Sequence, residues 1–200
     1  MAQDYWSLLN GDGKIVWGPD AELTPLGIQQ AKDNHTAWKE QISKKIRLPQ
    51  AYYSSPFTRS LDTMLYTWKG ISLDFDNALR PLVMEDLRED IGVHTCDKRR
   101  TRSFIEGRFG SIVDIEPQLT EEDELWSTQH RETHSEHDAR SRDFLNYVFD
   151  LDWKSETPVD YVSVTSHSGT TNSLLSVIGH RRFQLGTGGM IPVIVRAQKL

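Results

Sequence analysis

The chain has 200 residues, a formal net charge of −6 and a single cysteine, Cys96. This length suits one domain with a full core, spanning residues 1–200. No apolar run reaches the roughly eighteen residues of a membrane span, and no basic stripe favours a nucleic-acid partner. The first residues lack the basic and apolar regions of a secretory signal, and one cysteine excludes an internal disulfide. We therefore expect a cytoplasmic protein that binds neither membranes nor nucleic acid.

Helical and strand patterns alternate along the chain. Thr24-Pro25 is a typical helix start, with an N-cap followed by proline at the first helical position, and Ser55-Pro56 repeats it. The stretch from about 93 to 130 has little periodicity and indicates an inserted lobe. The alternation predicts a three-layer α/β fold, with a mostly parallel sheet and helices on both faces. Helices are expected at about 25–42, 56–69, 135–149 and 168–178, and strands at 51–55, 71–75, 161–165 and 193–195.

The turn Thr165-Ser-His-Ser-Gly169 joins a predicted strand to a predicted helix. Free backbone N–H groups at the start of a helix, at the positive end of its dipole, form an anion site. His167 can donate to a phosphate bound there, and Ser166 or Ser168 can add hydroxyl contacts. In the alternative interpretation, Ser168 is only an N-cap and His167 is a surface residue of the turn.

Two further segments carry polar side chains near predicted strand ends. Arg59 lies in the first turn of a helix, and Glu89 lies in the acidic segment Glu85-Asp-Leu-Arg-Glu-Asp90. Because the carboxyl ends of parallel strands share one edge of a sheet, Arg59, Glu89 and His167 can converge there. Such a group would offer charge stabilisation, a proton donor and a phosphate ligand for phosphoryl transfer. Alternatively, Arg59 pairs with Asp62 on its own helix, and most of the carboxylates are simply solvated.

Three histidines, His130, His134 and His137, recur at spacings that would place them on one helix face, where they could ligate zinc. Their segment is wholly polar and offers no paired cysteine. We therefore expect that neither these histidines nor Cys96 bind a metal, and we expect no cofactor. The cluster Gly186-Thr-Gly-Gly lacks the lysine of a phosphate loop and indicates a turn.

Four short blocks follow one another along the chain: Leu23-Thr-Pro-Leu-Gly-Ile-Gln-Gln-Ala31, Ser55-Pro-Phe-Thr-Arg-Ser60, Leu87-Arg-Glu89 with Gly92-Val-His-Thr-Cys-Asp-Lys-Arg99, and Ser166-His-Ser-Gly169. Together they resemble the histidine phosphatase (phosphoglycerate mutase-like) superfamily, particularly its fungal members. The resemblance covers nearly the whole chain, and the combination of blocks is specific although each block alone is not. It implies a phosphoglycerate mutase-like fold and hydrolysis of a small phosphorylated substrate. It also implies a phosphate pocket formed by Arg59 and His167, with Glu89 as proton donor to the leaving group.

The chain departs from the family in one respect. The family's nucleophilic histidine lies in an Arg-His-Gly motif on the first strand, upstream of the Leu-Thr-Pro-Leu-Gly block, and this sequence contains no Arg-His-Gly. Because Arg59, Glu89 and His167 are all present, we expect an N-terminally incomplete version of an active phosphatase. The alternative is a non-catalytic protein that binds phosphate or a partner. Hydrolysis is favoured over mutase activity as the reaction, and the oligomeric state is left open.

Overall fold

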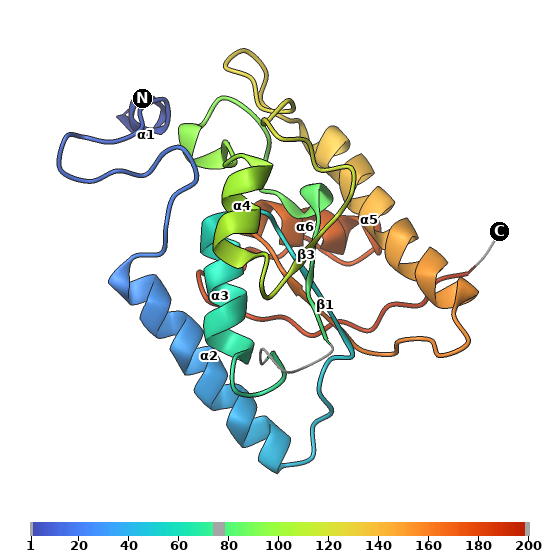
Figure 1. Cartoon of the computed structure of the whole chain (residues 1–200). Coiled ribbons are helices and arrows are strands. Elements are labelled where there is room, and N and C mark those ends of the chain that lie inside the picture. Colours follow the sequence, from blue (N-terminus) through green and yellow to red (C-terminus); the bar gives the residue numbers. More distant parts are fainter. Residues whose placement is uncertain (1, 74–78, 199–200) are drawn as a thin grey trace.

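The computed structural model describes residues 2–73 and 79–198. A four-stranded sheet with helices on both faces forms the body of the molecule (Figure 1). All pairs of neighbouring strands are parallel, so the predicted α/β class and parallel sheet are confirmed. The strand order is β3–β2–β1–β4, with β1 at Ala51–Ser54, β2 at Leu82–Val83, β3 at Asp114–Ile115 and β4 at Val162–Thr165.

The helices divide between the two faces of this sheet. One face carries α2 (Pro25–Ser43), α3 (Thr58–Trp68) and α4 (Arg102–Phe109). The other carries α5 (His134–Lys154), α6 (Ser168–Val177) and the short 3₁₀ helix η1 (Glu85–Leu87). A second 3₁₀ helix, η2 (Thr95–Asp97), and the N-terminal α1 (Ala2–Ser7) lie outside these layers. Among the described residues, no helix is both long and apolar enough to cross a bilayer.

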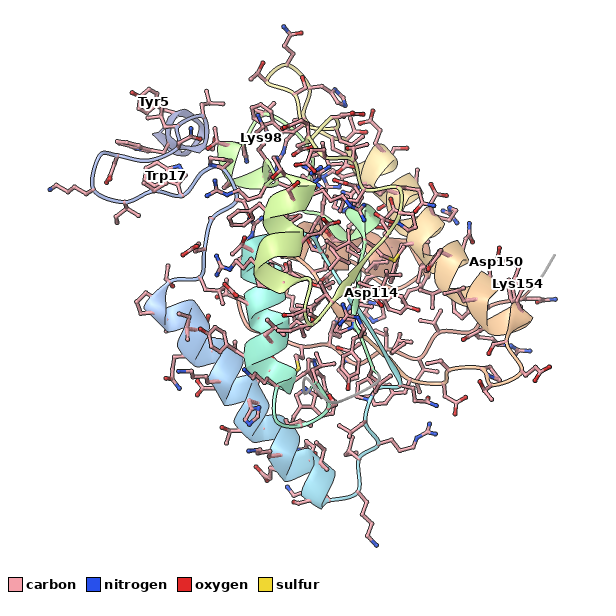
Figure 2. The ribbon with its side chains drawn as sticks, in the orientation of Figure 1. Tyr5, Trp17, Lys98, Asp114, Asp150 and Lys154 are labelled. Carbon is pink, nitrogen blue, oxygen red and sulfur yellow. The ribbon has the colours of Figure 1, made fainter. Side chains whose placement is uncertain are left out.

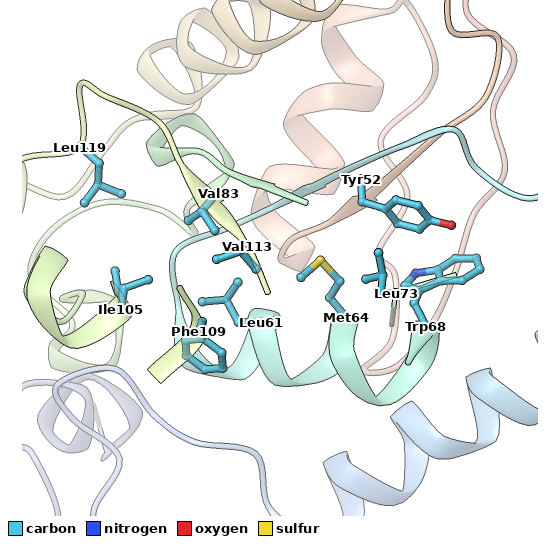
Figure 3. Close-up of a cluster of buried hydrophobic side chains, with 10 residues drawn as sticks. All are labelled: Tyr52, Leu61, Met64, Trp68, Leu73, Val83, Ile105, Phe109, Val113 and Leu119. Atoms are coloured by element: carbon cyan, nitrogen blue, oxygen red, sulfur yellow. The ribbon is translucent and has the colours of Figure 1, made fainter. Parts of the chain in front are cut away.

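Strand β1 builds a core on each face of the sheet, because successive side chains of a strand point in opposite directions. Tyr52 packs against Trp68 of α3, with ring centroids 5.3 Å apart. Its neighbour Tyr53 packs against Phe144 of α5, with centroids 5.5 Å apart. Figure 3 shows the first core, whose buried side chains are Tyr52, Leu61, Met64, Trp68, Leu73, Val83, Ile105, Phe109, Val113 and Leu119.

The start of each long helix is fixed by a threonine cap. Thr24 Oγ1 accepts a hydrogen bond from Gly27 N at 3.1 Å, and α2 begins where the sequence predicts. Thr133 and Glu136 form a reciprocal capping box that starts α5 at His134. His130 therefore precedes the helix, so the one-face arrangement that the histidine spacing would allow does not form.

The N-terminal arm, residues 2–20, lies beside the body of the molecule, and Tyr5 and Trp17 lie on it (Figure 2). Trp17 packs edge-on against Trp6 with centroids 6.0 Å apart. The arm joins the body at η2, where Thr95 Oγ1 donates to Leu9 O at 2.6 Å.

The structure corrects one predicted strand, and a second falls partly outside the described residues. Within residues 180–198 no strand forms, and Ile194 is fully exposed. Apolar alternation alone does not make a strand, because a strand also needs a neighbour for its backbone hydrogen bonds. In the stretch predicted at 71–75, residues 71 and 72 form a turn, and residues 74 and 75 lie outside the described residues. The segment 93–130 is more ordered than predicted, since it contributes α4 and β3.

Candidate active site

The carboxyl ends of three parallel strands meet at one edge of the sheet. Ser55 N, just after β1, donates to Thr165 O at the end of β4 at 3.0 Å. Met84 N, just after β2, donates to Ser54 O at 2.9 Å. The turns that leave these strand ends carry the predicted side chains: Arg59 in the first turn of α3, Glu89 just after η1, and His167 at the N-cap of α6.

His167 lies in the middle of this edge. Its Nε2 is 2.8 Å from Ser55 Oγ and 3.2 Å from Ser60 Oγ, and its ring packs edge-on against buried Phe57. Burial lowers the pKa of His167 well below its usual range, and the positive charge of Arg59 lowers it further. The imidazole is therefore neutral at neutral pH and can donate only one N–H. These contacts overturn the alternative that His167 is a surface residue.

Arg59 reaches the same edge from α3. Its guanidinium stacks over the Phe57 ring, 4.4 Å from the centroid, so Arg59 and His167 contact the same aromatic side chain. Nη1 donates to Cys96 O at 2.9 Å, and Nη2 donates to Asp97 Oδ1 at 3.2 Å. The alternative pairing with Asp62 is wrong, because Asp62 instead accepts from Arg108 at 2.9 Å.

Glu89 faces the first turn of α6. Its carboxylate accepts from Asp90 N at 3.1 Å and from Gly169 N at 3.4 Å. A Cβ at position 169 would overlap Glu89 Oε1, so the close approach requires glycine there. Burial raises the pKa of Glu89, and the negative charges of Asp90 and Asp97 raise it further. The side chain therefore keeps its proton to a higher pH than an ordinary glutamate, as suits a general acid.

The two serines of the turn have main-chain partners. Ser168, predicted as a phosphate ligand, is exposed, and its hydroxyl donates to Leu185 O at 3.4 Å. Ser166 Oγ donates to Leu87 O at 2.7 Å and so ties the turn to the segment that bears Glu89. Sequence reasoning missed the hydroxyl groups of Ser55 and Ser60 as partners of His167. The position of Ser55 at the end of a predicted strand was the available signal.

A cluster of possible metal ligands includes Asp90, the residue that follows Glu89 in the chain. Ligand atoms of Asp90, Glu132 and His137 are all within 4.8 Å of one another, and His137 Nδ1 is 2.7 Å from Asp90 Oδ1. Both carboxylates already pair with guanidinium groups, Asp90 with Arg131 at 3.4 Å and Glu132 with Arg140 at 2.7 Å. These contacts favour an ion-pair network over a metal centre. That none of the histidines binds a metal remains a prediction.

Cys96 lies next to the site and makes contact through its carbonyl group, which accepts from Arg59. Burial raises the pKa of its thiol to about 11, with a further contribution from the Asp97 carboxylate. The thiol is therefore protonated at neutral pH and is a weak nucleophile.

The fold is thus a parallel α/β sheet with a histidine, an arginine and a glutamate of raised pKa at its carboxyl edge, where α/β proteins commonly bind ligands. Residues 3–187 match the family model of the histidine phosphatase superfamily (branch 1). The chain belongs to this family.

Relatives of this chain bear phosphomutase and mutase names. It is 43% identical over 195 residues to a probable phosphoglycerate mutase of Arthroderma benhamiae, covering 98% of this chain and 56% of that protein. It is 35% identical over 192 residues to phosphomutase-like protein 3 of Candida albicans, covering 96% and 56%. It is 34% identical over 207 residues to a probable phosphoglycerate mutase of Saccharomyces cerevisiae, covering 96% and 69%. The chain thus spans little more than half the length of the first two proteins.

Solved structures share the fold. A putative α-ribazole-5′-phosphate phosphatase of Escherichia coli superposes with a TM-score of 0.54 at 16% identity, covering 88% of this chain and 79% of that one. A mycobacterial glucosyl-3-phosphoglycerate phosphatase in complex with inorganic phosphate superposes with a TM-score of 0.51 at 20% identity, covering 84% and 75%.

Proposed function

We propose that this chain binds the phosphate group of a small phosphomonoester at the carboxyl edge of its sheet, and that the reaction served by this site is phosphomonoester hydrolysis. The observation that carries the proposal is the grouping of Arg59 and His167 around Phe57, with the Glu89 carboxylate against the first turn of α6. The phosphatase names of the solved proteins with this fold support the choice of hydrolysis.

Each side chain has a role that its surroundings support. The described contacts of Arg59 use two of the five N–H donors of a guanidinium, which leaves donors for phosphate oxygens. A bound dianion beside His167 would favour protonation of the imidazole and so strengthen its hydrogen bond to phosphate. Glu89, whose raised pKa favours retention of its proton, would give that proton to the leaving oxygen.

The step that this sequence does not support is transfer of the phosphoryl group to a histidine. It contains no Arg-His-Gly, and the two histidines nearest the site face carboxylates, His94 that of Asp97 at 3.7 Å and His137 that of Asp90 at 2.7 Å. Others lie farther away. His35 Nδ1 bonds to Thr67 O between α2 and α3, and His180 is exposed after the end of α6. Loss of a positioned nucleophile costs on the order of 10⁴–10⁶ in turnover. The same observation favours a second candidate function, binding of phosphate without turnover.

The test measures binding and turnover separately. Inorganic phosphate binding by the 200-residue chain is followed by ³¹P NMR or calorimetry, with His167→Ala as the test variant and His180→Ala as the control. Turnover of an aryl phosphate is compared with that of a version extended by an N-terminal strand that bears Arg-His-Gly. We expect phosphate binding that is lost in His167→Ala, and rapid turnover in the extended version alone. Absence of phosphate binding would refute the site. Equal turnover by both versions, abolished by His167→Ala, would show that turnover does not depend on an Arg-His-Gly histidine, contrary to the proposal.

A further inference from the structure

The segment that bears Glu89, residues 86–92, has almost no regular secondary structure, yet a single side chain holds much of its backbone. Arg140 of α5 donates through Nη1 to Asp86 O at 2.6 Å and to Arg88 O at 3.0 Å. Its Nη2 donates to Glu89 O at 3.3 Å. Three carbonyl groups of the segment thus converge on one planar guanidinium, whose fork fixes their relative positions.

Arg140 is itself held by Glu132, which also binds the segment. Glu132 accepts from Arg140 Nε at 2.9 Å and from Nη2 at 2.7 Å. Its second contact is with the backbone, because Glu132 Oε2 accepts from Ile91 N at 3.1 Å. The ion pair therefore satisfies both acceptors and donors of a backbone that lacks partners from a helix or strand. Both side chains are nearly buried, at 9% and 7% exposure, so these hydrogen bonds compete little with water.

The same segment is held from the opposite side by the elements that carry His167. Thr170 Oγ1 of α6 donates to Arg88 O, and Ser166 Oγ donates to Leu87 O at 2.7 Å. Gly169 N reaches the carboxylate of Glu89 itself. Glu89 is thus fixed between α5 on one side and the turn of His167 on the other.

We propose that Arg140 is a positioning residue, which sets the place of the Glu89 carboxyl group relative to His167 by holding the backbone of residues 86–89. The inference rests on the proposed function, in which Glu89 gives a proton to an oxygen of a phosphate held by His167. Arg140 makes no contact with the anion in this account, and it acts only through the segment. A lysine at position 140 keeps the positive charge but cannot bind three carbonyl groups and a carboxylate in one plane.

Arg80 offers a matched control. It also binds one carboxylate, Asp114 at 2.7 Å, and three carbonyl groups, those of Gly110, Ser111 and Val113. Its contacts lie at the start of β3, away from the segment of Glu89. Arg80→Lys therefore removes the same kind of interaction without touching the proposed acid.

The experiment follows the titration of Glu89 by NMR of carboxyl-labelled glutamate in the 200-residue chain, in Arg140→Lys and in Arg80→Lys. The charged or titratable groups of the elements around Glu89 are Arg59, Arg88, Asp90, Asp97, Arg131, Glu132, His137, Arg140 and His167, and their number is the same in the lysine variant. We expect the pKa of Glu89 to fall toward the ordinary glutamate range in Arg140→Lys, because the loosened segment admits water to its carboxyl group. Amide exchange at Leu87 and Arg88, whose N–H groups bond within η1, should rise at least about tenfold. Neither quantity should change in Arg80→Lys.

An unchanged Glu89 titration in folded Arg140→Lys would overturn the inference, as would an equal change in Arg80→Lys. If Arg140→Lys does not fold, Glu132→Gln replaces it, since it weakens the same ion pair while keeping an acceptor for Ile91 N. Because Glu132→Gln also removes a negative charge near Glu89, the measurement is then amide exchange at Leu87 and Arg88, which should rise by a smaller factor, and no rise would overturn the inference. Inorganic phosphate binding is measured alongside and should be retained in all three variants. Failure of the parent chain to bind phosphate refutes the proposed function, whereas titration and amide exchange decide the role of Arg140.

Discussion

Arg88, the neighbour of Glu89, is a fully buried guanidinium whose replacement by methionine should destabilise the protein strongly. Its Nη1 and Nη2 each donate to the Asp123 carboxylate at 2.7 Å, and Nη1 also donates to Glu85 Oε1 at 2.6 Å. Nη2 reaches Asp97 O at 3.0 Å as well. Methionine matches much of the volume but leaves Asp123, whose side chain is 1% exposed, without this counter-charge. Breaking such a pair from one side costs about 3–5 kcal/mol of unfolding free energy.

At about 2–4 °C per kcal/mol for a chain of this size, that loss lowers the midpoint of thermal unfolding by roughly 6–20 °C. The assay is urea unfolding followed by tryptophan fluorescence, with Arg47→Ala as the control. Arg47 pairs with Asp160 at 3.2 Å on the surface, where such a pair contributes at most about 1 kcal/mol. A cost for Arg88→Met as small as that of Arg47→Ala would refute the idea that the buried network stabilises the segment.

The pH dependence of the Arg88→Met effect follows from Asp123. Burial alone would raise the pKa of this carboxyl group, but the hydrogen bonds and charge of Arg88 hold it below its usual range. A lowered folded-state pKa contributes stability that is present above the ordinary aspartate value near 4 and is lost as the pH falls through the folded value. The difference between the parent chain and Arg88→Met should therefore shrink below about pH 4.

Three further predictions concern single sites. Asp90→Asn should lower the pKa of Glu89, because it removes one of the negative charges that raise it, and NMR titration of the carboxyl group measures this; a rise would contradict the electrostatic account. Thr24→Ala should cost about 1 kcal/mol in urea unfolding, through loss of the α2 cap, and no loss would show that the cap is dispensable. Val164→Lys should reduce association at high concentration by light scattering, because it places a charge on β4, which pairs only with β1 among the described strands. An equal effect of Val16→Lys, on the exposed N-terminal arm, would argue against the edge of β4.

The sequence predicted those parts of the fold whose causes are local. The Thr24-Pro25 start, the strand at 51–54 and the strand-turn-helix around His167 each follow from caps, β-branched or aromatic residues and turn residues within about ten positions. Parallel pairing of the strands then predicted that Arg59, Glu89 and His167 lie at one edge of the sheet, but it did not predict their individual contacts. The strand predicted at 193–195 failed because its formation depends on a neighbour, and a single stretch of sequence does not reveal which edge is available.

The residues that hold Glu89 were missed because they are polar side chains in a buried stripe. In α5 the apolar positions Phe144 and Val148 predict the buried face, and the same stripe continues toward the start of the helix through His137, Arg140 and Ser141. A helical pattern is recognised from apolar residues alone, so the sequence predicts that the first half of α5 is exposed to solvent. Extending the stripe by three and four positions would have placed His137 and Arg140 inside, although their partners in residues 86–92 follow only from the tertiary structure.

Glu89 and Asp90 are adjacent in the chain, but their surroundings shift the two pKa values in opposite directions. A hydrogen bond from His137 lowers the pKa of Asp90, whereas burial raises that of Glu89. The negative charge of Asp90 in turn disfavours ionisation of Glu89, so Glu89 keeps its proton to a higher pH than its neighbour does. Two carboxyl groups whose pKa values are shifted apart in this way can take different chemical roles. The fold achieves this by directing Asp90 toward His137 and Arg131 and Glu89 toward Gly169 in the first turn of α6, next to the edge where the proposed substrate would bind.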